Sequence, residues 1–173
     1  MKIFGVDPGT ICTGYGVVVG QDRDIELIDC GVVQAPQRKP IEERLLVMYR
    51  GLRKLIQRHQ PNVLAVEQPF VAQGPRKSAL AVGEAHAMAL LAAAEYGIPV
   101  HQYPPAKVRK TVAGYGGGGK EQVRDMVSLL LGRSLDNYPL DTSDALAVAL
   151  CHTQQIALRE LAGETAPLHG RKR

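Results

Sequence analysis

The stretch KIFGVDPGTICTGYGVVVG, residues 2–20, decides the fold of this chain of 173 residues. Its two apolar runs, residues 3–6 and 15–19, predict two strands that are separated by a glycine-bearing turn. The first strand ends on a carboxylate, Asp7, and Pro8 and Gly9 follow it at once. Burial of a carboxylate costs free energy unless a cation meets it. The pattern therefore predicts that something cationic lies close to Asp7.

Length and composition indicate a single domain over residues 1–162. With 45% hydrophobic residues, the chain can bury a core of ordinary size. No apolar stretch reaches the ~18 uncharged residues of a membrane span, and the first residues lack the features of a signal peptide, so we expect a cytoplasmic protein. Residues 163–173 are expected to form a disordered basic tail. Three separate cysteines, which indicate neither a disulfide framework nor a zinc site, are expected to be buried: Cys12, Cys30 and Cys151.

The chain carries a modest excess of basic residues. Lysine and arginine number 21 against 17 acidic residues, which gives a formal charge of +4 and an isoelectric point near 9.1. This balance favours an anionic partner, although many ordinary proteins share it. For any one basic cluster alone, a solvated surface is the simpler interpretation. The clusters are Arg76 with Lys77, then Lys107, Arg109 and Lys110, then Lys120 and Arg124, and finally residues 171–173.

Periodicity divides the chain into strands and helices. Three successive strands with short connections indicate an antiparallel meander, and helical spacing begins after Pro40 and stops at Pro61. The next strand is continuously apolar, as buried parallel strands are, and it also ends on a carboxylate, Glu67. These patterns predict an α/β fold in which helices cover both faces of a mixed five-stranded sheet. The expected strands are 3–6, 15–19, 25–33, 62–66 and 98–103, and the expected helices are 41–60, 78–96, one from 105, 120–131 and one from about 142.

Four carboxylates are candidates for a metal site. Asp7 and Glu67 stand at the carboxyl ends of strands, where open α/β sheets bind their ligands. Asp141 and Asp144 are three residues apart at the start of the last helix and so point the same way. Their simpler interpretation is helix capping, with Asp141 as the N-cap and Asp144 as the acid of a capping box. If all four converge, they require hard cations such as Mg²⁺ or Mn²⁺, as two-metal phosphoryl transfer does.

Five motifs, taken in order over residues 1–152, resemble those of the RuvC family of bacterial Holliday-junction resolvases. They are FGVDPGTICTGYGVV, VLAVEQPFVAQ, SALAVGEAHA, KVRKTVAGYG with KEQVRDMV, and DTSDALAVALCH. The resemblance implies an RNase H-like fold and a homodimeric endonuclease of recombination and DNA repair. It implies paired symmetric nicks in four-way DNA junctions that leave 5′-phosphates, and two Mg²⁺ or Mn²⁺ ions in each active site. By the same resemblance, the branch-migration proteins RuvA and RuvB are expected partners.

The resemblance also assigns roles to individual residues. Catalysis and metal binding fall to Asp7, Glu67, Asp141 and Asp144, although some relatives carry histidine in place of Asp141. An aromatic residue of the family that stacks on DNA bases corresponds to Phe70, which by itself would more often be a packing anchor. The residues expected to contact DNA are Phe70, Arg76, Lys77, Arg109, Lys110 and Lys120.

The alanine-rich helix expected over residues 78–96 is nearly apolar all round. Such helices are buried on more than one side. Two explanations remain open: the helix lies inside the monomer, or one face packs on the sheet and the other on a second copy of the chain. In the second case, Ala85 and Ala89 are expected on the outward face. An isologous dimer would suit the near two-fold symmetry of a junction.

Two rival functions remain open on the sequence. VDPGTICTG also resembles the first phosphate loop of sugar kinases, actin and heat-shock ATPases. Those proteins bind nucleotide between two related domains and are usually far longer, which argues against them. The other rival is a catalytically silent DNA-binding module in which the four acids serve as helix caps.

Overall fold

The computed structural model describes residues 1–21, 24–69, 76–114 and 119–163, and for residues 21 and 76–79 it describes the backbone alone. The expected tail therefore lies outside the described residues from residue 164 onward. Among the described helices, none combines the length and apolar character that a membrane crossing requires. The strands are β1 (Lys2–Asp7), β2 (Cys12–Gln21), β3 (Asp24–Gln34), β4 (Val63–Glu67) and β5 (Val100–Tyr103), and the helices are α1 (Ile41–His59), α2 (Arg76–Glu95), α3 (Pro105–Ala113), α4 (Lys120–Leu131) and α5 (Leu140–Leu161).

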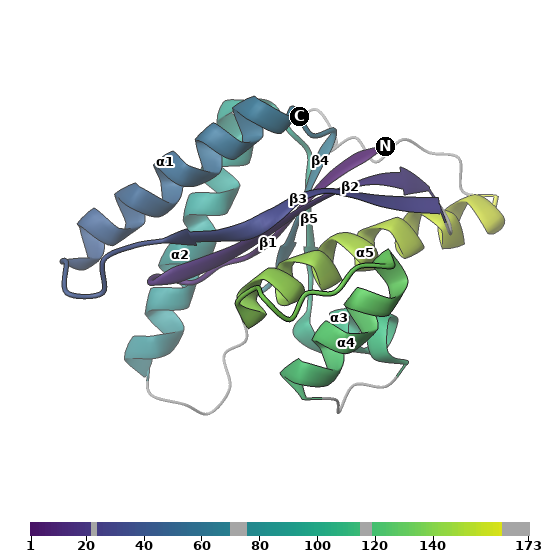
Figure 1. The fold of residues 1–173 in the computed structure, drawn as a ribbon. Helices are drawn as coiled ribbons and strands as arrows, with labels where there is room; N and C mark the ends of the chain where they lie inside the picture. Colours follow the sequence, from purple (N-terminus) through teal and green to yellow (C-terminus); the bar gives the residue numbers. More distant parts are fainter. Residues whose placement is uncertain (22–23, 70–75, 115–118, 164–173) are drawn as a thin grey trace.

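A mixed sheet in the order β3-β2-β1-β4-β5 forms the centre of the molecule (Figure 1). Strands β1, β2 and β3 pair antiparallel, as the predicted meander requires. Strand β4 lies parallel to β1, with Val6 opposite Val66, and β5 lies parallel to β4. Asp7 and Glu67 directly follow this pair of valines, so the two carboxylates are neighbours at one edge of the sheet.

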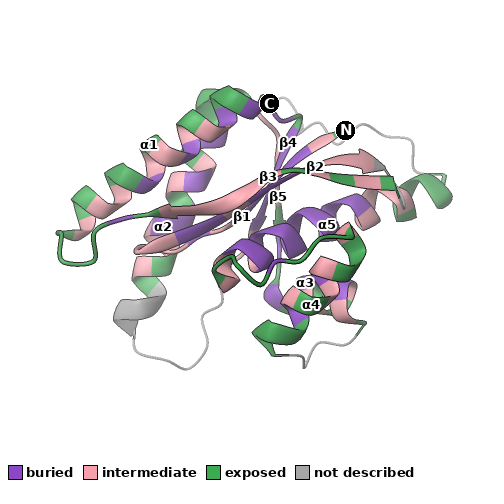
Figure 2. Ribbon diagram, viewed as in Figure 1, coloured by how far each residue is buried: buried purple, intermediate pink, exposed green. Residues whose placement is uncertain are grey.

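Alternation along β1 divides its side chains between two cores on opposite faces of the sheet. Ile3 joins the core under α3, α4 and α5, whereas Phe4 and Val6 join the core under α1 and α2. Successive side chains of a strand point to opposite faces, so both faces are apolar and both need cover. Figure 1 shows the two groups of helices on either side of the sheet, and Figure 2 shows buried residues where they meet it. The predicted α/β architecture is thereby confirmed.

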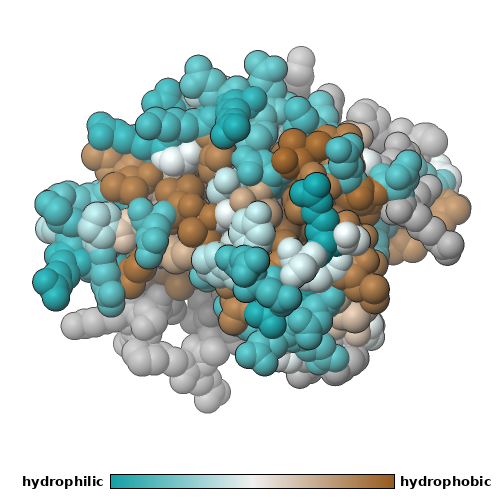
Figure 3. All heavy atoms as spheres, viewed as in Figure 1, coloured by the Kyte–Doolittle hydropathy of each residue, from teal (hydrophilic) through white to brown (hydrophobic). Residues whose placement is uncertain are grey.

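Helix α1 is amphipathic, as its spacing of apolar residues predicts. Met48, Leu52 and Ile56 are buried toward the sheet. Figure 3 shows hydrophilic side chains along the outer side of this helix. The helix ends at His59, its C-cap Gln60 takes a left-handed backbone conformation with φ 45°, and Pro61 follows directly.

Helix α2 packs on the sheet through one face. Ala85 and Ala89 belong to this buried face, with exposed fractions of 2% and 0%, whereas Leu80 and Leu91 are 66% and 52% exposed. The expectation that Ala85 and Ala89 face outward is therefore wrong, because the small alanines, and not the leucines, approach the sheet. The interior position proposed for this helix is also excluded, since its leucine-bearing face is exposed in the single chain.

Candidate active site

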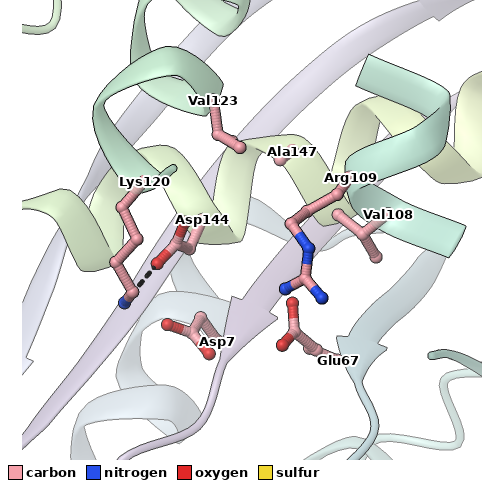
Figure 4. A pocket seen from close by; sticks show the side chains of 8 residues that line it. All are labelled: Asp7, Glu67, Val108, Arg109, Lys120, Val123, Asp144 and Ala147. Carbon is pink, nitrogen blue, oxygen red and sulfur yellow. Dashed lines mark hydrogen bonds and ion pairs between the residues drawn. The ribbon is translucent and has the colours of Figure 1, made fainter. Parts of the chain in front are cut away.

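Two carboxylates lie next to each other at the carboxyl ends of the parallel strands β1 and β4. Asp7 closes β1 opposite Gly14 of β2, and Glu67 closes β4 opposite Tyr103 of β5. Figure 4 shows the side chains of Asp7 and Glu67 next to each other in one hollow. Their position follows directly from the parallel pairing of β1 and β4.

The turn between β1 and β2 fixes the backbone beside Asp7. The Gly9 amide donates a hydrogen bond of 3.2 Å to Thr13 Oγ1, and this hydroxyl donates one of 2.8 Å to the Gly9 carbonyl oxygen. A Cβ at Gly9 would lie 2.2 Å from the Cys12 carbonyl oxygen, so the tight turn requires glycine. The sequence Asp7-Pro8-Gly9 thus leads into a tight turn that hydrogen bonds between Gly9 and Thr13 stabilise.

Helix α5 brings the other two acids to this edge because glycines let it approach the sheet closely. A Cβ built on Gly14 would lie 1.8 Å from the carbonyl oxygen of Asp141, and one on Gly5 would lie 2.2 Å from that of Ala145. Both contacts are with helix backbone, which cannot rotate away as a side chain can. Because α5 packs directly on β1 and β2, Asp141 and Asp144 lie toward Asp7.

The sequence interpretation placed Gly14 in the turn, and this was wrong. Strand β2 begins at Cys12, so Gly14 and Gly16 lie two apart on the face that α5 covers. Two glycines at strand spacing signal a close backbone approach, and that signal was available in the sequence.

The capping interpretation of the acidic pair is also wrong. The N-cap of α5 is Pro139, and no side chain makes a capping hydrogen bond there. Asp144 instead accepts a bond of 2.7 Å from Lys120 Nζ. Its carboxylate therefore faces the hollow and not the backbone of its own helix.

Two cations complete the hollow around the acids. Lys120, the first residue of α4, bonds to Asp144, and Figure 4 shows the Arg109 guanidinium beside Glu67. The positive charge of Lys120 also acts on Asp7, although its bond goes to Asp144. The residues that line the hollow are Asp7, Glu67, Val108, Arg109, Lys120, Val123, Asp144 and Ala147.

The hollow carries more negative charge than these cations offset. Burial, followed by the charges of Glu67 and Asp144, raises the pKa of Asp7 to about 8. Burial, followed by the charge of Asp144, raises the pKa of Glu67 to about 7, while Arg109 acts in the opposite direction. Both carboxyls are thus poised to bind either a proton or a further cation near neutral pH.

The donor set fits a hard divalent cation. In the ranges that the structure describes, no three acidic, histidine or cysteine side chains are drawn together in the spacing of a metal centre. The acids in the hollow offer carboxylate oxygens, which are the ligands that Mg²⁺ and Mn²⁺ prefer. A divalent ion would also supply positive charge that offsets the negative charges of Asp7 and Glu67.

Asp141 lies to one side, against Cys12. Burial, followed by a hydrogen bond to Asp141, raises the pKa of the Cys12 thiol to about 12. Cys12 is therefore a neutral thiol that donates to the carboxylate. It is half-buried, as is Cys30, whereas Cys151 is fully buried, so the expectation of three buried cysteines holds for Cys151 alone. The sequence interpretation overlooked Cys12 because its contact depends on where α5 lies.

The other residues predicted to contact DNA are distributed as follows. Phe70 lies outside the described residues. Arg76 and Lys77 begin α2, and their side chains are likewise not described. Lys110 is exposed on α3 and does not line the hollow. Among the described side chains of this group, Arg109 and Lys120 are the two that line the hollow.

Comparison with known proteins points to one family. The family model described as crossover junction endodeoxyribonuclease RuvC matches residues 3–152. A protein of that name from Chloroflexus aurantiacus is 46% identical over 152 residues, which cover 88% of this chain and 92% of the relative. Another from Dehalococcoides mccartyi is 44% identical over 161 residues, with coverage of 93% and 96%.

Solved structures agree with the sequence comparison. Thermus thermophilus RuvC, in complex with a Holliday junction substrate, matches with a TM-score of 0.83 at 33% identity and covers 91% of this chain and 96% of its own. The yeast mitochondrial Holliday junction resolvase Ydc2 matches with a TM-score of 0.65 over 95% of this chain and 84% of its own. At 11% identity, Ydc2 shows the likeness of the fold alone.

Proposed function

The chain belongs to the RuvC family of crossover junction endodeoxyribonucleases, and from this premise we propose that it resolves Holliday junctions with the acidic hollow described above. It is a nuclease whose expected substrate is a four-way DNA junction, cut by paired symmetric nicks during recombination and repair. The observation that carries the proposal is one hollow lined by three carboxylates, from β1, β4 and α5, and by two cations.

The carboxylates have separate proposed roles. Asp7, between its neighbours and least compensated, would hold the divalent ions together with Glu67 and Asp144. Asp141 either binds a metal or orients the attacking water. Mg²⁺ or Mn²⁺ held by these residues would supply an activated water and offset negative charge on the phosphate. Hydrolysis breaks the bond between phosphorus and the 3′ oxygen, so the products are a 5′-phosphate and a 3′-hydroxyl.

The two cations of the hollow have a proposed role toward the DNA. Lys120 and Arg109 contact phosphate oxygens beside the bond that is cut, which requires Lys120 to leave its bond with Asp144. Phe70 stacks on bases at the crossover, and Arg76, Lys77 and Lys110 contact the backbone. These contacts provide affinity and position the strand, whereas the carboxylates provide the chemistry.

The proposed assembly follows from the substrate. A junction has two strands to cut, related by near two-fold symmetry, and a homodimer presents two sites in matching orientation. RuvA and RuvB are the proposed partners in branch migration, and the cytoplasm, which holds bacterial DNA, is the proposed location.

Cleavage of a synthetic mobile junction tests the function directly. The wild-type protein should cut with Mg²⁺ or Mn²⁺ and stay inactive in EDTA. Asp7→Asn is nearly isosteric but removes the bridging charge, so cleavage should fall by orders of magnitude while junction binding survives. Asp125→Asn, at an exposed position on α4, is the matched control and should cut normally. Unchanged cleavage by Asp7→Asn, or wild-type binding without metal-dependent cleavage, would contradict the proposal.

A further inference from the structure

A second hollow lies on the outer side of the edge strand β5. Its lining comes from β5, from the first turn of α3 and from the later turns of α5, and it shares no lining residue with the acidic hollow. Strand β5 ends the sheet, so this side of the strand faces α5 and solvent. The lining includes Gln102, Tyr103, Lys107, Gln155 and Arg159.

The charge of this second hollow is positive. Lys107 from α3 and Arg159 from α5 both line it, and its lining contains no acidic residue. In the described ranges, no carboxylate oxygen lies within 4 Å of the charged nitrogens of either side chain, whereas Lys120 has Asp144 as its partner. Two cations that approach one hollow repel each other unless an anion lies between them. The amide of Gln155 adds hydrogen-bond donors.

The floor of the second hollow is a neutral aromatic group. Tyr103 is 7% exposed, its hydroxyl is hydrogen-bonded to His152 Nδ1 at 2.6 Å, and Lys107 Nζ lies 5.6 Å from its ring centroid. Burial, followed by the charges of His101 and Arg159, lowers the pKa of His152 to about 3, so this imidazole is uncharged at neutral pH. This neutral floor adds no charge to the hollow, so the positive charge that an anion would meet there comes from Lys107 and Arg159.

We propose that the second hollow binds a phosphodiester group of the DNA backbone, outside the bond that is cut. The inference rests on the proposed function and adds a contact to it. Lys107 lines the second hollow and Arg109 the acidic one, so α3 borders both. Tyr103 pairs with Glu67 across β5 and β4, which places the two hollows about one strand apart. A DNA strand held at the acids thus has a second cationic site within reach of its backbone.

The salt dependence of junction binding tests this contact. The double variant Lys107→Gln/Arg159→Gln removes both charges and keeps polar side chains at exposed positions. Each lost phosphate contact lowers the slope of log affinity against log salt by ~0.9, so the double variant should lower it by about two in EDTA, where no cleavage occurs. The control, Arg50→Gln/Lys54→Gln, removes the same charge from exposed positions on α1 and should keep the wild-type slope.

Titration with inorganic phosphate separates DNA from a free anion as the occupant. Phosphate should shift the NMR resonances of Gln102 and His101 in the wild-type protein but not in the double variant. A phosphate shift together with an unchanged salt slope would overturn the inference, because the hollow would then bind a free anion only. Absence of both effects would overturn it as well. A protein that binds junctions without cutting them would contradict the proposed function alone, since the slopes remain measurable.

Discussion

At the scale of single residues, uncompensated charge distinguishes Asp7 from the other acids. Asp144 has Lys120 at 2.7 Å, and Arg109 acts on Glu67 to lower its pKa. Asp7 is half-buried between them, and its pKa rises to about 8. A proton or a divalent cation must therefore meet Asp7 at neutral pH, which couples metal binding to the stability of the fold.

We expect Asp7→Asn to stabilise the metal-free protein at pH 8. The pKa of Asp7 is higher in the folded chain than the ordinary value of 3.8, so the folded state binds the proton more tightly. The contribution of Asp7 to stability is then lost as the pH rises from about 4 to about 8. Asparagine mimics the protonated acid, so the variant should gain on the order of 5 kcal/mol over the wild type at pH 8 and little at pH 4. Thermal melts of both proteins in EDTA across this range measure the difference.

Addition of Mg²⁺ completes this experiment. The ion should raise the melting temperature of the wild type at pH 8 and that of Asp7→Asn much less, because the bridging charge is missing. Asp125→Asn should follow the wild type in both conditions. A variant that is less stable than the wild type at pH 8 would show that Asp7 already has a cation or hydrogen-bond partner.

The positions of Asp7 and Glu67 at strand ends could be predicted from sequence, but the partners of the acids could not. Asp7 and Glu67 each follow an apolar strand, and position at a strand end is a local property. The bond from Lys120 to Asp144 joins residues 24 apart in the chain. It depends on how α4 lies against α5, which no local pattern specifies.

At the scale of elements, the close packing of α5 on the glycines of β1 and β2 determines where Asp141 and Asp144 lie. Hydrophobic periodicity predicted the elements well, because alternation and helical spacing are local signals. It failed to orient α2, since a helix that is apolar all round has no polar face to mark its outer side. It also failed at Gly14, because the strand spacing of Gly14 and Gly16 was not used to extend β2 to Cys12.

Gly14→Ala should therefore damage both the fold and the site. The new Cβ would lie 1.8 Å from the Asp141 carbonyl oxygen, so α5 must move away from β2. Such overpacking costs roughly 1 to 3 kcal/mol, and the shift should also weaken metal binding by moving the acids. Gly83→Ala is the control, since no atom lies within 4 Å of its added Cβ, and it should be neutral or stabilising by about 0.5–1 kcal/mol. Equal melting temperatures for the two variants would show that α5 adapts without cost.

At the scale of the whole molecule, an exposed apolar face remains on α2. Leu80 and Leu91 are 66% and 52% exposed there, and Leu46 of the neighbouring helix α1 is 43% exposed. A group of exposed apolar side chains on neighbouring helices is the kind of surface that binds another protein, whereas single exposed apolar residues are common. A second copy of the chain is the occupant that the proposed function requires, because paired nicks need two active sites.

Leu91→Glu should therefore convert a dimer into a folded monomer that cannot make paired nicks. A charge buried in an apolar interface must be desolvated, so association through this face should weaken strongly. The fold should survive, because Leu91 is half exposed and its helix packs through the opposite face. Leu129→Glu places the same charge on α4, where the leucine is 73% exposed, and should leave both assembly and cleavage intact. Sedimentation gives the mass of each variant, and a cruciform plasmid distinguishes paired from single nicks because only paired nicks linearise it. A dimeric Leu91→Glu protein would place the interface on another surface, whereas a monomer that still linearises the plasmid would break the link between dimerisation and paired cleavage.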